Sequence, residues 1–255
     1  MFHSDMFLHE YKPAKLHNAL VVVGFPSVGL VSSIAANYVV RTMKLDRIAT
    51  IISKEFPPYA ILHDGVPSPP VRIYAGKRDC AEDKDGEDCD QIVVIMSEFM
   101  PRPDLIKPLA DIIIDYCQKK GVKTILALEG INTGEGEKDA VLGAETSHGV
   151  QGRLEKYGIT PMREGMVSGI SGVILSEGDR LGVDVLCLLG PAKADMPDAR
   201  GAARLLEMVG KMLPEIKLDP APLFKEAELI ETEMKGAMES VKQPRKPGDE
   251  SYLYG

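Results

Sequence analysis

The sequence predicts a three-layer α/β/α domain with a mostly parallel β-sheet, followed by a C-terminal helix and a flexible tail. Two observations support this fold class. Short runs of β-branched and other apolar residues, such as Ala19–Gly24 and Val183–Leu189, are typical of strands buried on both faces. Amphipathic stretches of helical length alternate with these runs, as in parallel sheets covered by helices. With 255 residues, 44% of them hydrophobic, the chain can form one large core.

The individual elements follow from apolar periodicity and from residues that begin or end helices. Pro103 suits the first turn of a helix and Gly121 suits the position after its last turn, so a helix is expected over 103–120. Pro214 ends a second helix, expected over 200–213. The other predicted elements are strands over 19–24, 47–53, 122–128 and 183–189, a helix over 28–43, and a hairpin of strands 71–74 and 91–96.

The chain is expected to have three parts. Residues 1–213 form the α/β domain, residues 214–242 a helical extension, and residues 243–255 a linker with a C-terminal tail. Asp219 is a good N-cap and Pro220 suits the first helical position, so the helix of the extension begins there. Its apolar stripe would pack either on its own domain or between subunits. The linker, QPRKPGDE, is too rich in proline and charge to enter a core.

Charge and composition exclude several classes of protein. The formal net charge is −8, and only 5% of the residues are aromatic. A nucleic-acid-binding surface needs clustered positive charge, and a base-stacking platform needs aromatic side chains, so no nucleic-acid partner is expected. No apolar run approaches the roughly 20 residues of a membrane span, and the first residues do not resemble a signal peptide. We therefore expect a cytoplasmic protein with no membrane partner.

The four cysteines suggest two different environments. Cys80 and Cys89 flank an acidic loop between the two hairpin strands and could close it with a disulfide. Two unpaired thiols are the favoured alternative, because cytosolic disulfides are rare outside hyperthermophiles. Cys117 and Cys187 lie in apolar segments and are expected in the core. There is no CxxC pair, so no zinc site is predicted.

Three glycine-rich segments are candidate sites for a small ligand. In Gly24–Gly29, backbone N–H groups at the start of a helix could bind an anion, although close packing of helix on strand is the favoured explanation of these glycines. Glu129 follows a predicted strand and would lie at the carboxyl edge of the sheet, where open α/β folds bind ligands. Gly165–Gly172 is expected to form a third such loop. The candidate residues are Gly24, Ser27, Gly29, Glu129, Gly169 and Ser171.

Nothing in the sequence requires an enzyme. A Ser171–His148–Asp64 triad can be imagined, but no recognised spacing supports it. Neither the metal-binding HExxH pattern nor the phosphate-binding GxxxxGK[ST] pattern is present. No catalytic residue, metal or cofactor is therefore predicted. The alternative hypothesis is a nucleoside- or nucleotide-binding protein, or an enzyme with phosphorylase-like or ligase-like activity, that uses the glycine-rich loops.

Seven segments carry a family resemblance. They are GFPSVGLVSSIAANYVV at 24–40, LHDGVPSPPVRIYAG at 62–76, VVIMSEFMPRP at 93–103, ALEGI at 127–131, GISGVIL at 169–175, DARGAARLLEMV at 198–209 and PLFKEAELIE at 222–231. Together they resemble the archaeal branch of the proteasome assembly chaperone family over nearly the whole chain. The resemblance implies an α/β fold like that of nucleoside phosphorylases, and symmetric homo-oligomers.

The resemblance also implies a role for the end of the chain. Some members of that family end in a hydrophobic residue, a tyrosine and any third residue, and here the ending is Leu253-Tyr254-Gly255. In proteasome activators the same ending enters pockets between neighbouring α-subunits of the core particle. We therefore expect a non-enzymatic assembly or activation factor whose partners are proteasome α-subunits and further copies of itself.

The chemistry of these three residues suits such docking. A buried leucine side chain contributes roughly 1.5–3 kcal/mol, and the ring of Tyr254 has a polar tip that suits a half-hydrated pocket. The carboxylate of Gly255 can pair with a lysine. One such tripeptide would bind weakly, but several tails on one oligomer would raise the avidity by about 10²–10⁴.

Overall fold

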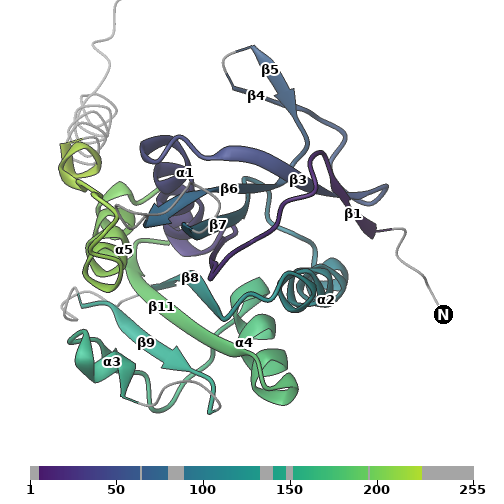
Figure 1. Cartoon of the computed structure of the whole chain (residues 1–255). Helices are drawn as coiled ribbons and strands as arrows, with labels where there is room; N and C mark the ends of the chain where they lie inside the picture. Colours follow the sequence, from purple (N-terminus) through teal and green to yellow (C-terminus); the bar gives the residue numbers. More distant parts are fainter. Residues whose placement is uncertain are drawn as a thin grey trace, which may run out of the picture.

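A nine-stranded mixed β-sheet forms the middle layer of the fold (Figure 1). The computed structural model describes residues 6–63, 65–79, 89–132, 140–147, 152–194 and 196–225. The strands lie in the order β1 (Met6–Glu10), β3 (Asp46–Ser53), β6 (Val71–Asp79), β7 (Asp90–Ser97), β2 (Leu20–Gly24), β8 (Thr124–Asn132), β11 (Asp184–Ala192), β9 (Leu142–Glu145) and β10 (Thr160–Pro161). The four strands from β7 to β11 are parallel, whereas β1, β3 and β6 pair antiparallel on one side of them and β9 pairs antiparallel with β11 on the other.

Helices cover both faces of this sheet. Helices α1 (Val31–Thr42) and α5 (Ala199–Met212) lie on one face, and α2 (Pro103–Lys119) and α4 (Gly169–Leu181) lie on the other (Figure 1). Alternate side chains of a strand therefore enter different cores: Val22 packs with α1 and α5, while Val21 and Val23 pack with α2 and α4. This arrangement confirms the predicted three-layer α/β fold.

Two predicted boundaries change in the structure. The helix expected over 28–43 begins with a short 3₁₀ turn, η1 (Val28–Leu30), and α1 starts only at Val31, because Gly29 and Leu30 have left-handed φ angles of 61° and 54°. The strand expected over 122–128 continues to Asn132.

The prediction of a loop over Gly165–Gly172 is wrong from residue 169 onward, because helix α4 begins at Gly169. Gly172 and Gly178 lie inside this helix and weaken its sequence signal, yet the space around each is filled: a Cβ on Gly172 would lie 2.1 Å from the carbonyl oxygen of Val167. Tertiary packing therefore stabilises a helix that local propensity does not indicate.

Several short elements have no clear sequence signal. They are the edge strand β1, the separate two-stranded hairpin of β4 (Ile61–His63) and β5 (Val66–Ser68), strands β9 and β10, and the one-turn helix α3 (Arg153–Lys156). Most have only two to four residues, which is too short to establish a helical or a strand period.

The helical extension starts as predicted. The backbone N–H of Ala221 donates a hydrogen bond of 3.0 Å to the Asp219 carboxylate, which caps the first turn. Leu223 is buried and Phe224 packs against the same core, so this first turn lies on its own domain. The rest of the extension, the linker and the tail lie outside the described residues.

The cysteines differ in part from expectation. Cys117 and Cys187 are buried and free, as predicted. Cys89, however, is disulfide-bonded, so the favoured expectation of an unpaired thiol is wrong for this residue. Cys80, its candidate partner in the sequence, lies outside the described residues. The physical reason is that β6 and β7 pair as far as Asp79 and Asp90, which brings the two ends of the acidic loop together.

Reduction of this disulfide is expected to lower the melting temperature. A native disulfide typically stabilises a protein by roughly 2–4 kcal/mol, through the entropy lost by the unfolded chain. Differential scanning calorimetry with and without reductant measures the effect. The Cys89→Ser variant should melt at the lower temperature in both conditions, and a wild-type melting temperature that is insensitive to reductant would contradict the prediction.

Candidate functional site

The carboxyl ends of β2 and β8 lie side by side at the centre of the sheet. Helix α1, which follows β2, covers one face of the sheet, and α4, which comes after β8 in the chain, covers the other (Figure 1). The adjacent parallel strand to β2 on its other side is β7, and the connections after β2 and β7 lead to α1 and α2 on opposite faces of the sheet. The carboxyl ends of strands at such a switch point are the usual ligand position in open α/β folds.

Three of the polar residues singled out in the sequence meet at this point. Ser27 follows β2, Glu129 lies in β8 and Ser171 lies in the first turn of α4. The Oγ of Ser27 accepts a hydrogen bond of 3.0 Å from the backbone N–H of Gly130, and both Ser27 and Ser171 lie close enough to the carboxyl group of Glu129 to lower its pKa. Gly169 lies at the same place: a Cβ on it would be 4.0 Å from Oε2 of Glu129. We call Ser27, Glu129 and Ser171 the switch-point cluster.

The carboxyl group of Glu129 is held in an unusual environment. Its side chain is 8% exposed, and burial raises its pKa to about 7, although hydrogen bonds with Ser171, the Gly130 backbone and Ser27 act in the opposite direction. Glu129 in turn adds to the effect of burial in raising the pKa of Cys187 on β11. A group with this pKa exchanges a proton near neutral pH, so the cluster has acid–base capacity.

The glycines near this point have a packing explanation. A Cβ on Gly24 would lie 2.4 Å from the Cβ of Ala36, because α1 packs directly on β2. A Cβ on Gly29 would lie 2.9 Å from the carbonyl oxygen of Lys193. Close approach of helix and strand, the interpretation favoured from the sequence, therefore accounts for Gly24. Gly29 is explained instead by its left-handed φ of 61° and by its contact with the segment after β11.

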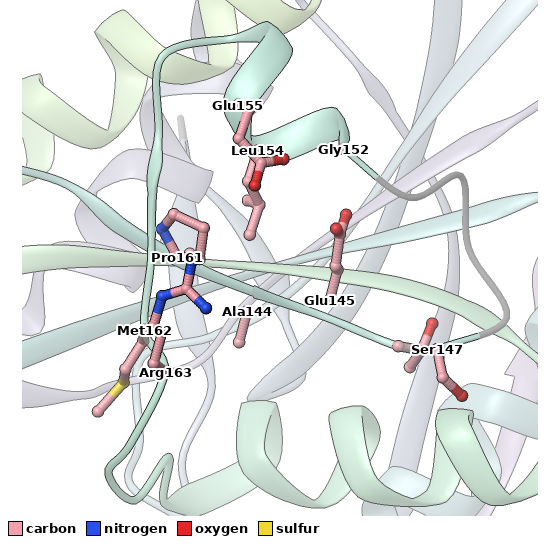
Figure 2. A pocket seen from close by; sticks show the side chains of 11 residues that line it. Ala144, Glu145, Ser147, Gly152, Leu154, Glu155, Pro161, Met162 and Arg163 are labelled. Atoms are coloured by element: carbon pink, nitrogen blue, oxygen red, sulfur yellow. The ribbon is translucent and has the colours of Figure 1, made fainter.

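Two hollows of the described surface lie elsewhere, along β9. Two adjoining hollows of about 440 and 520 Å³ lie between α3 and α4, and neither is lined by Ser27, Glu129 or Ser171. They share the residues Ala144, Glu145, Thr146, Ser147, Met162 and Arg163. Figure 2 shows β9 crossing the view between α3 and the segment Pro161–Arg163, with the Arg163 guanidinium turned toward Pro161. We call this combined hollow the β9 trough.

Several polar groups that line the β9 trough form hydrogen bonds or lie close to an opposite charge. The backbone N–H and the hydroxyl of Ser147 donate hydrogen bonds of 2.7 and 2.6 Å to Oδ1 of Asp179. Oε2 of Glu145 lies 3.8 Å from Nε of Arg153, and neither buried atom has a hydrogen-bond partner within the described residues. Arg163 is exposed and makes no ion pair with any residue that the structure describes.

The described residues also bear on a membrane-spanning helix, a metal site and the imagined catalytic triad. In the described ranges, no helix is both long and apolar enough to cross a membrane. Nor do those ranges hold a group of three or more side chains arranged for a metal ion. His148 and Asp64, the other members of the imagined triad, lie outside the described residues, and Ser171 itself is buried and donates to the carbonyl of Leu128 at 3.2 Å.

Comparison with known proteins settles the family. A model of the PAC2 family matches residues 21–238, which is most of the chain. This chain belongs to the PAC2 family. An uncharacterised protein of Methanocaldococcus jannaschii is 30% identical over 92% of this chain and 91% of its own length.

Solved structures of the same fold include two from Pyrococcus furiosus. PbaA, described as an archaeal homologue of a proteasome-assembly chaperone, is 30% identical, covers 92% of this chain and 93% of its own, and has a TM-score of 0.80. PbaB, described as an archaeal proteasome activator, is 19% identical, covers 92% of this chain and 100% of its own, and has a TM-score of 0.76. At this identity the likeness supports the fold alone.

In this PAC2-family chain the matched range contains the switch-point cluster and the β9 trough, whereas the tail lies beyond it. The sequence pointed to the members of the cluster one by one, through glycine-rich turns at strand ends. It did not point to Glu145 or Arg163, because the short strand β9 and the segment after β10 have no distinctive pattern.

Proposed function

We propose that this protein is a non-enzymatic assembly or activation factor for the archaeal proteasome. It acts as a homo-oligomer and docks Leu253-Tyr254-Gly255 into pockets between proteasome α-subunits. The observation that carries the proposal is the likeness to PbaA, which extends over 92% of the chain at 30% identity. The residues Leu253-Tyr254-Gly255 support it, because a hydrophobic residue and a tyrosine follow a linker rich in proline and charge.

The docking proposal is tested by two single substitutions in neighbouring tyrosines. Tyr254→Ala removes a ring from the proposed docking residues and should weaken binding to α-rings at least about tenfold, since several tails act together. Tyr252→Ala removes the same group just outside them and should stay within about twofold of wild type. Native mass spectrometry with purified α-rings gives both values. Equal losses for the two variants, or no loss for either, would overturn the docking proposal.

Self-association has its own support in the β4–β5 hairpin, which projects from the body (Figure 1). Its side chains Leu62 and Val66 are 68% and 55% exposed. An isolated two-stranded hairpin is marginally stable, so contact with a second copy would stabilise this one. The mass of the intact protein under native conditions tests the proposal, and a monomer at micromolar concentration would count against it.

A second candidate function is binding of a small molecule at the switch-point cluster. It is favoured by the meeting of Ser27, Glu129 and Ser171 at the carboxyl edge of the sheet. A thermal-shift screen with nucleosides, nucleotides and phosphate tests it. A ligand that raises the melting temperature of the wild type but not of Glu129→Gln would support this function, and a flat screen would leave the proteasome role alone.

A further inference from the structure

We propose that β1 pairs antiparallel with β1 of a second copy of this chain, so that one sheet runs through both subunits. The two-fold axis passes through Leu8. This pairing specifies one interface of the homo-oligomer proposed above and rests on that part of the proposed function, but it does not depend on docking to α-subunits. The opposite edge of the sheet, the backbone of β1 and its side chains each support the pairing.

The two edges of the nine-stranded sheet differ. One edge ends in β10, which has two residues, and one of them is Pro161. Proline and short length are two ways in which proteins prevent an edge strand from pairing with another chain. The other edge is β1, which lies beside β3 (Figure 1) and has five residues, MFLHE, with neither proline nor lysine. β1 therefore lacks these common protections of an edge that stays free.

The backbone of β1 has hydrogen-bonding groups that do not face β3. The N–H of Tyr11 donates to the carbonyl of Ile48 at 2.8 Å and so continues the antiparallel ladder between β1 and β3. Because alternate residues of such a strand face opposite neighbours, the N–H and C=O groups of Met6, Leu8 and Glu10 point away from β3. Among the described residues no strand lies on that side. A further strand can therefore add there.

A second copy of β1 matches this row of backbone groups by symmetry. With the two-fold axis at Leu8, the backbone of Leu8 faces the partner's Leu8, and Met6 faces the partner's Glu10. This register pairs all five residues of each strand. An axis at Phe7 or His9 instead would leave two residues of each strand unpaired. The register centred on Leu8 is therefore the one that satisfies the most backbone groups.

The exposed side chains of β1 suit an apolar interface. Phe7 lies directly opposite Ile52 of β3, and these residues are 54% and 37% exposed on the same face of the sheet. In the proposed pairing Phe7 faces the partner's His9, and the two Phe7 rings lie diagonally, within reach of each other. The ring of His9 already packs edge-on against Tyr11, with 5.1 Å between the ring centroids. The pairing therefore covers apolar surface that one copy alone exposes.

The other face of β1 brings no conflict of charge. Met6 and Leu8 pack partly buried against the core that α2 covers, and Glu10 forms an ion pair of 2.8 Å with Lys120. The pairing therefore places no unpaired carboxylates side by side across the new ladder. Five residues from each copy form a smaller contact than a standard protein interface, so we expect reversible pairing.

Disulfide trapping tests both the contact and its register. Position 7 would lie opposite the partner's position 9 in a pair without mutual hydrogen bonds, where Cα atoms are about 4.5 Å apart and a disulfide can form. Equal positions would lie about 8 Å apart on the diagonal, which is too far. An oxidised equimolar mixture of full-length Phe7→Cys and His9→Cys proteins should therefore give at least about fivefold more crosslinked dimer than either variant alone. Non-reducing gel electrophoresis gives the yields, with the wild type as background.

A second mixture provides the matched control. Ile52→Cys places a thiol on the same face but one strand further from the partner, about 10 Å from its position 9. Its mixture with His9→Cys should therefore stay at the wild-type background. Equal yields in the two mixtures would overturn the pairing, and efficient crosslinking of Phe7→Cys or His9→Cys alone would overturn the register centred on Leu8.

Native mass spectrometry of the same proteins separates failure of this interface from failure of the proposed function. Background crosslinking in a protein of oligomeric mass would overturn the β1 pairing alone. A monomeric mass would count against self-association as a whole.

Discussion

The Gly130→Ala variant should be less stable than the wild type by about 3 kcal/mol, the upper end of the range for overpacked cores. A Cβ at position 130 would lie 2.3 Å from the carbonyl oxygen of Val28 and 2.8 Å from Cγ2 of Val31. The nearest atom belongs to the backbone of the turn after β2, and β8 is held between two parallel neighbours, so neither side can move away at low cost. The hydrogen bond from Gly130 to Ser27 would be lost as well.

Urea unfolding measures this change, and a second glycine provides the control. Gly210 lies in α5, and a Cβ added to it would have no atom within 4 Å, so Gly210→Ala should be neutral or stabilise by up to about 1 kcal/mol. If the two variants unfolded at the same urea concentration, close approach at Gly130 would not be the reason for this glycine.

Between pH 5 and pH 8 the protein should lose stability because of Glu129. Its pKa is raised to about 7 in the folded state, from an ordinary value of 4.5. Below both values the carboxyl is protonated in either state and contributes nothing. Between them the folded state binds more protons than the unfolded state, so the free energy of unfolding falls as the pH rises. The full difference is about 3 kcal/mol and is reached above pH 7.

The Glu129→Gln variant isolates this contribution, because glutamine keeps the shape and an acceptor oxygen but does not titrate. Its stability should depend less on pH between 5 and 8, and at pH 8 it should exceed that of the wild type. Glu155→Gln, on the exposed face of α3, is the control and should follow the wild-type pH profile. Parallel pH profiles for wild type and Glu129→Gln would show that Glu129 titrates normally.

Local sequence signals were sufficient for the long elements. β2, β11, α2 and α5 were predicted within a few residues, because a run of buried β-branched residues or a helical stripe is a property of consecutive residues. α4 was not predicted, because its glycines lower helix propensity and only their neighbours in the fold explain them. The disulfide of Cys89 was not the favoured expectation either. That expectation rested on the rarity of disulfides in the cytosol, a rule that carries no information on how β6 and β7 pair.

The sequence by itself determined the fold class, the family resemblance, and the identity of Ser27, Glu129 and Ser171 as residues at strand ends. Tertiary structure decided which of them meet and in what environment. The raised pKa of Glu129 depends on its burial where β2, β8 and α4 meet, and Ser27 and Gly130, which are in contact there, are 103 residues apart in the sequence. The β9 trough depends likewise on β9 pairing with β11 across some 40 residues. Such contacts are set by packing of the whole chain, and no local pattern encodes them.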